Sequence, residues 1–298
     1  MPDGSLAADI TWQAAVMPIA APDNVRDAVP PIVDAAWLRA HETAVLCDVR
    51  STMTSSTPDD DFAAAHLPGA VLVLLDDVLA GPPAGVEGRH PLPHPDAFAA
   101  SMGALGIGHD DLVVAYDDRG GAFASRLVWM LRIIGQRAAL LDGGLRAWDG
   151  PTATGPAERA TVQRPPTPWP AGSVADADEV VAHVEHGGVV VDSRDAARYA
   201  GETEPIDAVA GHVPGAVNVP FPLNLDAGGS FHSPEELAGR FRADGVDGEA
   251  IVYCGSGVTA CHNALAIERA GFGLPRVYVG SWSGWSSDTD RPVATGPE

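Results

Sequence analysis

Short apolar runs alternate with helix-like segments along this chain. Two such runs lie within residues 45–50 and 112–117, and two more occupy residues 189–191 and 251–253. Apolar runs this short, between polar and glycine-rich stretches, predict strands that are buried on both faces of a parallel sheet. Because helix-like segments separate them, the pattern predicts an α/β fold in which a mostly parallel sheet is flanked by helices.

The same order of segments occurs twice. Each copy has a strand, a His-x-Pro-Gly-Ala turn, a second strand, a helix-like stretch and a closing tryptophan. In the first copy these are 45–50, 66–70, 112–117, 125–134 and Trp148, and in the second 190–194, 212–216, 250–254, 259–270 and Trp285. A repeat of about 140 residues is far longer than a solenoid repeat and predicts two similar domains.

The expected division of the chain has four parts. We expect an N-terminal tail over residues 1–27, a first domain over 28–150, a linker over 151–172 and a second domain over 173–298. The linker is rich in Pro, Thr and Ala, which indicates a semi-rigid connection. One helix start in the second domain is well marked, because Ser233 and Glu236 form a capping-box pattern around Pro234.

Composition favours a soluble protein. Hydrophobic residues make up 46% of the 298 residues, which allows a sizeable core. No apolar run approaches the roughly 18 residues of a membrane span. The first basic residue is Arg26, and proline interrupts the apolar stretch 14–21, so the N-terminus lacks the pattern of a secretory signal. We therefore expect a cytoplasmic protein.

Charge and cysteine content narrow the partners. The formal net charge of −22 disfavours nucleic acids and anionic membrane surfaces, which both reward Lys and Arg. The three cysteines, Cys47, Cys254 and Cys261, are too few for a disulfide framework, and no pair has the CxxC spacing of a zinc site. We expect no metal and no organic cofactor.

Cys254 is the candidate reactive residue. It directly follows an apolar strand and precedes a predicted helix, and ligands of open α/β sheets bind at the carboxyl ends of strands. Gly255 and Gly257 allow successive backbone N–H groups to turn toward one point, and the helix adds its positive end. Such a ring of donors favours the thiolate, which is the nucleophile, and would hold the outer sulfur of a persulfide. An inert, buried cysteine is the alternative.

The segment 253–262, Tyr-Cys-Gly-Ser-Gly-Val-Thr-Ala-Cys-His, and the duplicated pattern together resemble the tandem-domain rhodanese-type sulfurtransferases. The resemblance runs from about residue 33 to Trp285 and implies two rhodanese-like domains. The loop is most similar to that of 3-mercaptopyruvate sulfurtransferases. Thiosulfate-specific members usually carry Cys-Arg-Lys-Gly, where this chain has Gly255 and Ser256 in place of the two cations.

The neutral loop bears on the sulfur donor. Thiosulfate is a dianion, and an ion pair at about 4 Å is worth roughly 4 kcal/mol at an effective dielectric constant of 20. The predicted function is therefore transfer of sulfur from 3-mercaptopyruvate, with release of pyruvate, to cyanide or a thiol such as thioredoxin or a low-molecular-weight thiol. The alternatives are a thiosulfate sulfurtransferase and, more distantly, a non-catalytic sulfur-carrier or binding module.

The resemblance also implies substrate-binding residues. Arg198 matches the arginine that grips the donor's carboxylate, and backbone groups of Gly255, Ser256, Gly257, Val258 and Thr259 would complete the binding loop. Pairing of Arg198 with Asp195 or Glu202 at the surface is the alternative. Mercaptopyruvate members often have a second arginine nine positions later, where this chain has Asp207, and Arg89 is a candidate replacement.

By the same resemblance, Ser256 acts with a histidine and an aspartate from the first domain. His90 and Asp76 match these positions and would form a Ser–His–Asp proton relay, although Asp77 sits beside Asp76. An exposed loop histidine is the alternative for His90.

The first domain has Asp117 where the second has Cys254. A carboxylate forms no persulfide, so the first domain is expected to lack catalysis and to contribute surface to an interdomain cleft. Cysteine phosphatases of related fold require Cys-x5-Arg, and Ala260 occupies the arginine position, which disfavours phosphatase chemistry.

Several other polar and aromatic residues are expected to be structural. His66 and His212 lie in the repeated turn, Arg50 and Arg194 follow a strand aspartate, and the tryptophans suit an aromatic core. The residues expected to serve the fold are His66, His212, Arg50, Arg194, Cys47, Cys261, Trp282 and Trp285.

Overall fold

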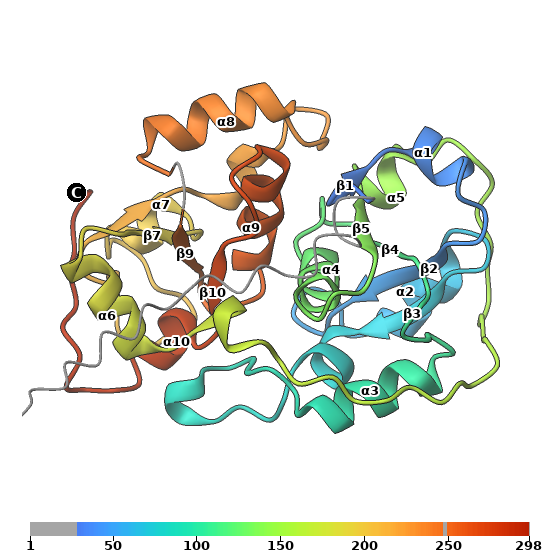
Figure 1. Ribbon diagram of the computed structural model, residues 1–298, viewed down its shortest axis with the longest axis horizontal. Coiled ribbons are helices and arrows are strands. Elements are labelled where there is room, and N and C mark those ends of the chain that lie inside the picture. The colour runs from blue at the N-terminus through green and yellow to red at the C-terminus, as the bar shows by residue number, and fades with distance from the viewer. Residues whose placement is uncertain (1–28, 247–248, 298) are drawn as a thin grey trace, which may run out of the picture.

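The computed structural model describes residues 29–246 and 249–297, and it contains two α/β units joined by an extended segment (Figure 1). The tail expected over residues 1–27 lies outside the described residues. Within the described chain, no helix is both long and apolar enough to cross a membrane.

Each unit contains a five-stranded sheet in which all strand pairs are parallel, as the apolar runs predicted. The strand orders, β1-β5-β4-β2-β3 and β6-β10-β9-β7-β8, are equivalent position by position. The first sheet comprises β1 (Ile32–Val33), β2 (Val45–Arg50), β3 (Val71–Leu74), β4 (Val113–Tyr116) and β5 (Ala138–Leu141). The second comprises β6 (Val174–Ala175), β7 (Val189–Asp192), β8 (Ala216–Asn218), β9 (Ala250–Tyr253) and β10 (Arg276–Tyr278).

Helices cover both faces of each sheet. In the first unit they are α1 (Ala35–Arg39), α2 (Pro58–Ala64), α3 (Pro95–Ala104), α4 (Ala124–Ile133) and α5 (Gly144–Ala147). In the second they are α6 (Ala177–Glu185), α7 (Ala196–Tyr199), α8 (Pro234–Ala243), α9 (Ala260–Arg269) and α10 (Ser281–Trp285). The predicted capping box at Ser233 and Glu236 is confirmed at the start of α8.

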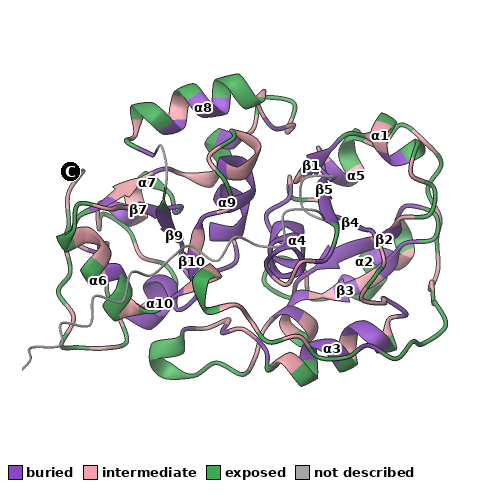
Figure 2. Cartoon of the chain, viewed as in Figure 1, coloured by how far each residue is buried: buried purple, intermediate pink, exposed green. Residues whose placement is uncertain are grey.

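One hydrophobic cluster runs through both units. It joins the inward faces of the two sheets with α3, α4, α8 and α9, whereas two separate clusters fill the outward faces. Figure 1 shows α4 and α9 side by side at the centre of the molecule, and they are in contact. Figure 2 shows that both helices are largely buried. The central strands of the two sheets, β4 and β9, therefore end beside the layer that α4 and α9 form together.

Polar contacts add to this interdomain packing. The Arg132 side chain on α4 donates to the Glu268 carboxylate on α9, with Nε 3.0 Å from Oε2. The Nε2 of His262 lies 3.1 Å from the carbonyl oxygen of Gly120 in the first unit. A buried polar contact of this kind holds the two units in one relative position.

A second crossing brings a first-domain loop onto the second domain. The 3-10 helix η2 (Gly85–Glu87) packs against α10, and the following Arg89 N–H donates to the Ser283 hydroxyl at 3.1 Å. In Figure 1 this segment reaches under α10 from the first unit. It carries Arg89 and His90 to the second domain.

Candidate active site

Cys254 follows the last residue of β9, at the carboxyl end of the second sheet. Its side chain is buried, and its sulfur accepts a hydrogen bond from the Gly257 N–H at 3.1 Å. Its own N–H donates to the Ser281 hydroxyl, also at 3.1 Å. The N–H groups of Ser256 and Val258 donate to no other group in the described part of the chain. The loop therefore presents a fixed sulfur with unused backbone donors around it.

The equivalent loop of the first domain already holds an anion. Asp117 follows the last residue of β4, and its buried carboxylate accepts hydrogen bonds from four backbone N–H groups at 2.8 to 2.9 Å. These donors belong to Arg119, Gly121, Phe123 and Ala124. A loop at this place in the fold is thus suited to bind negative charge, and Asp117 supplies that charge internally.

Ser256 meets the two residues that the resemblance assigned to it. The Nδ1 atom of His90 lies 2.8 Å from the Ser256 hydroxyl, and its Nε2 lies 3.6 Å from Oδ1 of Asp76. The other Asp76 oxygen accepts from the N–H and the hydroxyl of Thr52 at 3.0 and 2.8 Å. Because the proton of the neutral imidazole suits the side facing the carboxylate, Nδ1 is left to accept from Ser256.

Burial and hydrogen bonding set the protonation of His90 and Asp76. Burial lowers the pKa of His90 to about 4, and the nearby Arg126 charge adds to that effect. Burial alone would raise the pKa of Asp76, but the hydrogen bonds from Thr52 and Ser51 outweigh it and hold that pKa below its usual value. A neutral imidazole between a hydroxyl and a carboxylate is the arrangement that accepts a proton from the hydroxyl.

Two guanidinium groups converge on the other side of the loop. A Cβ atom placed on Gly255 would lie 3.4 Å from Nη1 of Arg198 on α7 and 3.4 Å from Nη2 of Arg89. Neither of these two nitrogens donates a hydrogen bond to any described residue. They therefore place two positively charged groups beside the residue that follows Cys254, Arg89 from the first domain and Arg198 from the second.

Both arginines also pair with carboxylates through their other nitrogens, Arg198 through Nε and Nη2 and Arg89 through Nη1. Arg198 donates to both oxygens of Glu204 at 2.8 and 3.0 Å, and Arg89 is paired with Asp207. The alternative partners considered for Arg198, Asp195 and Glu202, are therefore not the ones that it contacts. Burial raises the pKa of Asp207 while Arg89 opposes the shift. The residue at the position of the family's second arginine thus orients two cations instead of supplying one.

Sequence reasoning missed Arg126. This residue lies on α4, is fully buried, and donates to the carbonyl oxygens of Gly257 and His90 at 2.8 and 2.7 Å. It also donates to the carbonyls of Leu79 and Pro91. The available signal was a charge directly before the apolar run 127–131, which indicates a buried and specifically bonded arginine.

The residues expected to be structural lie in structural contacts. Arg194 pairs with Asp192 at 2.6 Å, and Arg50 pairs with Asp48 in the same way. The Nδ1–H groups of His66 and His212 in the two repeated turns donate to the backbone carbonyls of Phe62 and Tyr199 at 2.9 and 2.8 Å. The cysteines and tryptophans expected in the core are buried there: Cys47, Cys261, Trp282 and Trp285.

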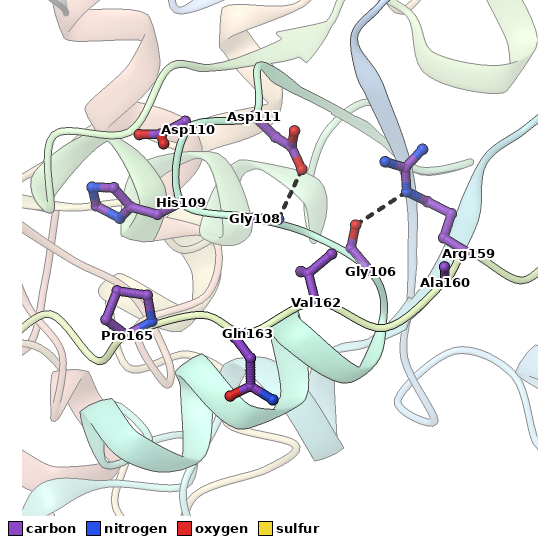
Figure 3. Close-up of a pocket in the computed structure, with 10 residues that line it drawn as sticks. All are labelled: Gly106, Gly108, His109, Asp110, Asp111, Arg159, Ala160, Val162, Gln163 and Pro165. Atoms are coloured by element: carbon purple, nitrogen blue, oxygen red, sulfur yellow. Dashed lines mark hydrogen bonds between the residues drawn. The ribbon is translucent and has the colours of Figure 1, made fainter.

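Three cavities of the described structure are lined by residues other than Cys254. One of about 690 Å³ lies between the loop 106–111 and the segment 159–165 of the first domain (Figure 3). In Figure 3 its rim is tied by bonds between Arg159 and Gly106 and between Asp111 and Gly108. Another of about 260 Å³ lies beside Arg50, and a third of about 520 Å³ lies under the η2 segment. Among the described residues, no three His, Cys, Asp or Glu side chains are grouped as a metal site requires.

The family follows from these features and from comparison with known sequences. The model of the rhodanese-like domain matches residues 34–150 and 176–288. The chain belongs to the rhodanese family, as a tandem-domain sulfurtransferase with one cysteine-bearing loop. The expected fold class, two tandem rhodanese-like domains, is confirmed.

Relatives within the family share most of the chain. It is 45% identical to a protein of Pseudomonas aeruginosa named "Probable 3-mercaptopyruvate sulfurtransferase", over 78% of this chain and 84% of that one. It is 31% identical to thiosulfate/3-mercaptopyruvate sulfurtransferase 2 of Arabidopsis thaliana, over 91% and 83%. The crystal structure of SseA from Escherichia coli, a protein of the 3-mercaptopyruvate type, matches with a TM-score of 0.72 and 30% identity, over 86% and 100%.

Proposed function

We propose that this sulfurtransferase takes sulfur from 3-mercaptopyruvate, carries it as a persulfide on Cys254, and delivers it to a thiol or to cyanide. The observation that carries the proposal is the position of the Cys254 sulfur. Unused backbone donors surround it, and two unpaired guanidinium nitrogens, from Arg198 and Arg89, lie over the adjacent Gly255. A donor whose sulfur lies a few bonds from a single carboxylate fits both features at once.

The first half-reaction conserves atoms and charge. The Cys254 thiolate attacks the donor sulfur, and an S–S bond forms while the donor's C–S bond breaks. The electron pair of that bond remains on the three-carbon fragment as the enolate of pyruvate. One proton moves from the new persulfide to the enolate carbon, so that pyruvate leaves and Cys254 carries –S–S⁻. No external oxidant or reductant enters.

Ser256, His90 and Asp76 are proposed to move that proton. The Ser256 hydroxyl belongs to the loop around the sulfur, and the neutral His90 ring accepts its hydrogen bond at 2.8 Å. The Asp76 carboxylate stabilises the imidazolium form as it develops. Backbone donors of Ser256, Gly257, Val258 and Thr259 are proposed to bind the charged outer sulfur.

The second half-reaction requires a nucleophilic acceptor. An acceptor thiolate attacks the outer sulfur, the S–S bond to Cys254 breaks, and the Cys254 thiolate returns. Thioredoxin, a low-molecular-weight thiol and cyanide are the proposed acceptors. Three free cysteines suit a reducing compartment, and the cytoplasm is the proposed location. We also propose that the first domain spans residues 28–150, the linker 151–172 and the cysteine-bearing domain 173–298.

Thiosulfate is the second candidate donor. The loop itself contains no cation, but Arg89 and Arg198 bring two positive groups beside Gly255. Glu204 and Asp207 neutralise most of that charge, which favours a donor with one negative charge over a dianion. A sulfur carrier without turnover is the more distant alternative.

A comparison of the two donors tests the proposal. The purified protein is incubated with each donor and with cyanide, and thiocyanate formation gives kcat/KM. We expect mercaptopyruvate to exceed thiosulfate by about tenfold or more, equivalent to 1.4 kcal/mol of discrimination. Intact-mass measurement after donor alone should show one added sulfur, absent from Cys254→Ala. A higher kcat/KM with thiosulfate would mean that thiosulfate is the donor. If wild type forms no more thiocyanate than Cys254→Ala, the proposal that the protein catalyses sulfur transfer is wrong.

A further inference from the structure

Arg126 is a buried cation without a carboxylate partner. Its guanidinium group is fully buried and makes four hydrogen bonds, all to backbone carbonyl oxygens. Among the ion pairs of the described residues, none includes Arg126. Carbonyls satisfy its N–H groups but leave its positive charge unbalanced, and an unbalanced buried charge is costly. Something nearby is therefore expected to carry negative charge when the protein functions.

The position of this charge points to the catalytic loop. Arg126 Nη1 donates to the Gly257 carbonyl at 2.8 Å and would lie 3.2 Å from a Cβ atom on Gly257. The Gly257 N–H, in turn, donates to the Cys254 sulfur. The Gly257 carbonyl and the Val258 N–H belong to one amide group, so a cation on the oxygen polarises the N–H that borders the sulfur site. Burial lowers the pKa of Arg126, and the Cys261 and Cys254 thiols oppose that shift.

The other charged groups around the loop are balanced or neutral. On α7 and in the η2 segment, Arg198 and Arg89 are paired with Glu204 and Asp207. His90 is neutral because its pKa is about 4. Arg126 remains as the uncompensated charge among the described groups that pack around the loop.

Cys261 on α9 stays a thiol, because burial raises its pKa to about 12. It donates to the Gly257 carbonyl at 3.4 Å, the same oxygen that Arg126 contacts. It therefore supports the position of the loop without supplying negative charge.

We propose that Arg126 is the fixed countercharge of the Cys254 sulfur and a positioning residue of the catalytic loop. The inference rests on the proposed persulfide cycle, in which the sulfur carries one negative charge both as thiolate and as persulfide. A permanent cation suits that constant charge, since arginine does not titrate in the working range of pH. The same side chain binds the His90 carbonyl and so fixes the relay against the loop. The first domain, which has Asp117 in place of a loop cysteine, thereby supplies the charge that the Cys254 loop lacks at Gly255 and Ser256.

The test is the pH dependence of Cys254 alkylation in the full-length protein. Iodoacetamide reacts with the thiolate, and peptide mass spectrometry reports Cys254 separately from the buried Cys47 and Cys261. In Arg126→Met, we expect the midpoint of the rate profile to rise by about one pH unit or more, which slows alkylation about tenfold at pH values below both midpoints. Arg126→Lys, which keeps the charge, should retain most of the wild-type midpoint while kcat falls through looser positioning.

Arg164→Met is the matched control. Arg164 is also a buried arginine without a carboxylate partner among the described residues; it lies in the linker, donates to the backbone carbonyls of residues 107 and 108 and to the Gln136 side-chain oxygen, and contacts no residue of the candidate site. It should lose stability and leave the alkylation midpoint unchanged. Equal midpoints in wild type, Arg126→Met and Arg126→Gln would overturn the inference, as would Arg126→Lys behaving like Arg126→Met.

A second measurement applies if the neutral variants of Arg126 do not fold. Wild type should be more stable to urea than Cys254→Ser at mildly alkaline pH, and this difference should shrink as the pH falls and the thiolate is protonated. A difference that does not change with pH would overturn the inference. Absence of thiocyanate from wild type rejects the proposed function, whereas the alkylation profile decides separately on Arg126.

Discussion

Asp117 and Cys254 occupy equivalent places in the two domains, each one residue beyond the end of a central strand. Preceding them, Tyr116 and Tyr253 both face a strand aspartate in the sheet register, and each phenol oxygen accepts a backbone N–H from the repeated turn. One loop holds a carboxylate bound by backbone N–H groups, and the other holds the sulfur that we propose becomes charged. The first domain thus offers an internal comparison for the anion binding that we propose for the Cys254 loop.

Replacing Asp117 should damage stability much more than activity. Asp117→Ala leaves four N–H groups, three of them buried, without their acceptor. We expect the free energy of unfolding to fall by about 3 kcal/mol, since buried unsatisfied groups cost roughly 1 to 3 kcal/mol each and part of the loss is recovered by relaxation. Urea unfolding measures the change. Asp118→Ala, at the partly exposed neighbour, is the control, and an equal loss in both variants would contradict the role of Asp117.

Arg89 and Asp207 should have opposite effects on donor binding. Arg89→Met removes one of the two free guanidinium nitrogens near Gly255 and should raise KM for mercaptopyruvate about tenfold, with a smaller change in kcat. Asp207→Asn removes the carboxylate that competes for both arginines and should lower KM several-fold.

Glu202→Gln controls for the loss of one negative charge from the same segment. Glu202 is exposed and pairs with neither arginine in the described structure, so its KM should match wild type. Steady-state kinetics with varied mercaptopyruvate gives all three values. An increase of KM in Asp207→Asn would mean that the carboxylate positions the arginines and that the donor does not compete with it.

The low pKa of His90 sets a limit on the pH profile of catalysis. Because that pKa is about 4, the ring stays neutral throughout the range in which an ordinary histidine gains its proton near pH 6.5. We expect kcat/KM to show no histidine-dependent loss between pH 7 and about 5. Profiles of wild type and His90→Gln decide the matter. A loss centred near pH 6.5 in wild type that disappears in His90→Gln would be the contrary result.

His262 should make the domain interface sensitive to acid. The Asn224 side-chain N–H donates to its Nδ1 at 3.0 Å, so the ring proton lies on Nε2, which donates to the Gly120 carbonyl across the interface. Protonation of Nδ1 would break the first contact. Burial accordingly lowers the pKa of His262 to about 4.

The lowered pKa of His262 determines how the free energy of unfolding changes with pH. Between about pH 6.5 and 4 the unfolded chain binds a proton at residue 262 that the folded protein excludes, so stability falls as the pH falls. Each such histidine contributes up to about 1.4 kcal/mol per pH unit. His262→Gln keeps one acceptor and one donor without titrating, and should show a shallower loss of urea stability between pH 7 and 5. Identical slopes would exclude His262 as a source.

The duplicated architecture could be predicted from the sequence because the residues of each strand by themselves form a recognisable apolar pattern. A short apolar run is buried wherever it packs, so residues 45–50 and 250–253 indicate strands without knowledge of their neighbours. The Cys254 loop was also readable, since glycines between a strand and a helix allow the left-handed backbone conformations that turn successive N–H groups toward one point, and Gly257 has such a φ of +78°. Asp117 was recognised as the counterpart of Cys254, but the sequence did not reveal that its carboxylate fills the amide ring.

The contacts between domains were not readable in the same way. Arg126 meets Gly257 only because α4 packs against α9, and no local pattern determines which helices of two domains face each other. The pairing of Arg198 with Glu204 depends on the path of the loop after α7, which carries little periodic signal. Arg89 was proposed from its position beside His90, and its contact with Asp207 required the crossing of the η2 segment.

Gly88 lies where the first-domain segment 85–90 crosses onto α10 of the second domain. Its φ is +85°, and a Cβ atom there would collide with the carbonyl oxygen of Gly280 and lie 2.9 Å from the Ser283 hydroxyl. Gly88→Ala should therefore push the segment away from α10 and displace Arg89 and His90 together. We expect kcat/KM to fall about a hundredfold, since small misplacements of catalytic groups have effects of that order.

Gly85→Ala separates the contact from backbone strain. Gly85 also has a positive φ, +45°, but a Cβ atom there meets nothing within 4 Å. Both variants share the cost of an alanine in a left-handed conformation, and only Gly88→Ala adds the collision with α10. Both should retain the wild-type rate of Cys254 alkylation within about threefold, because the sulfur and Arg126 lie outside the segment. Equal kcat/KM values in the two variants would mean that the close approach at Gly88 does not position the relay.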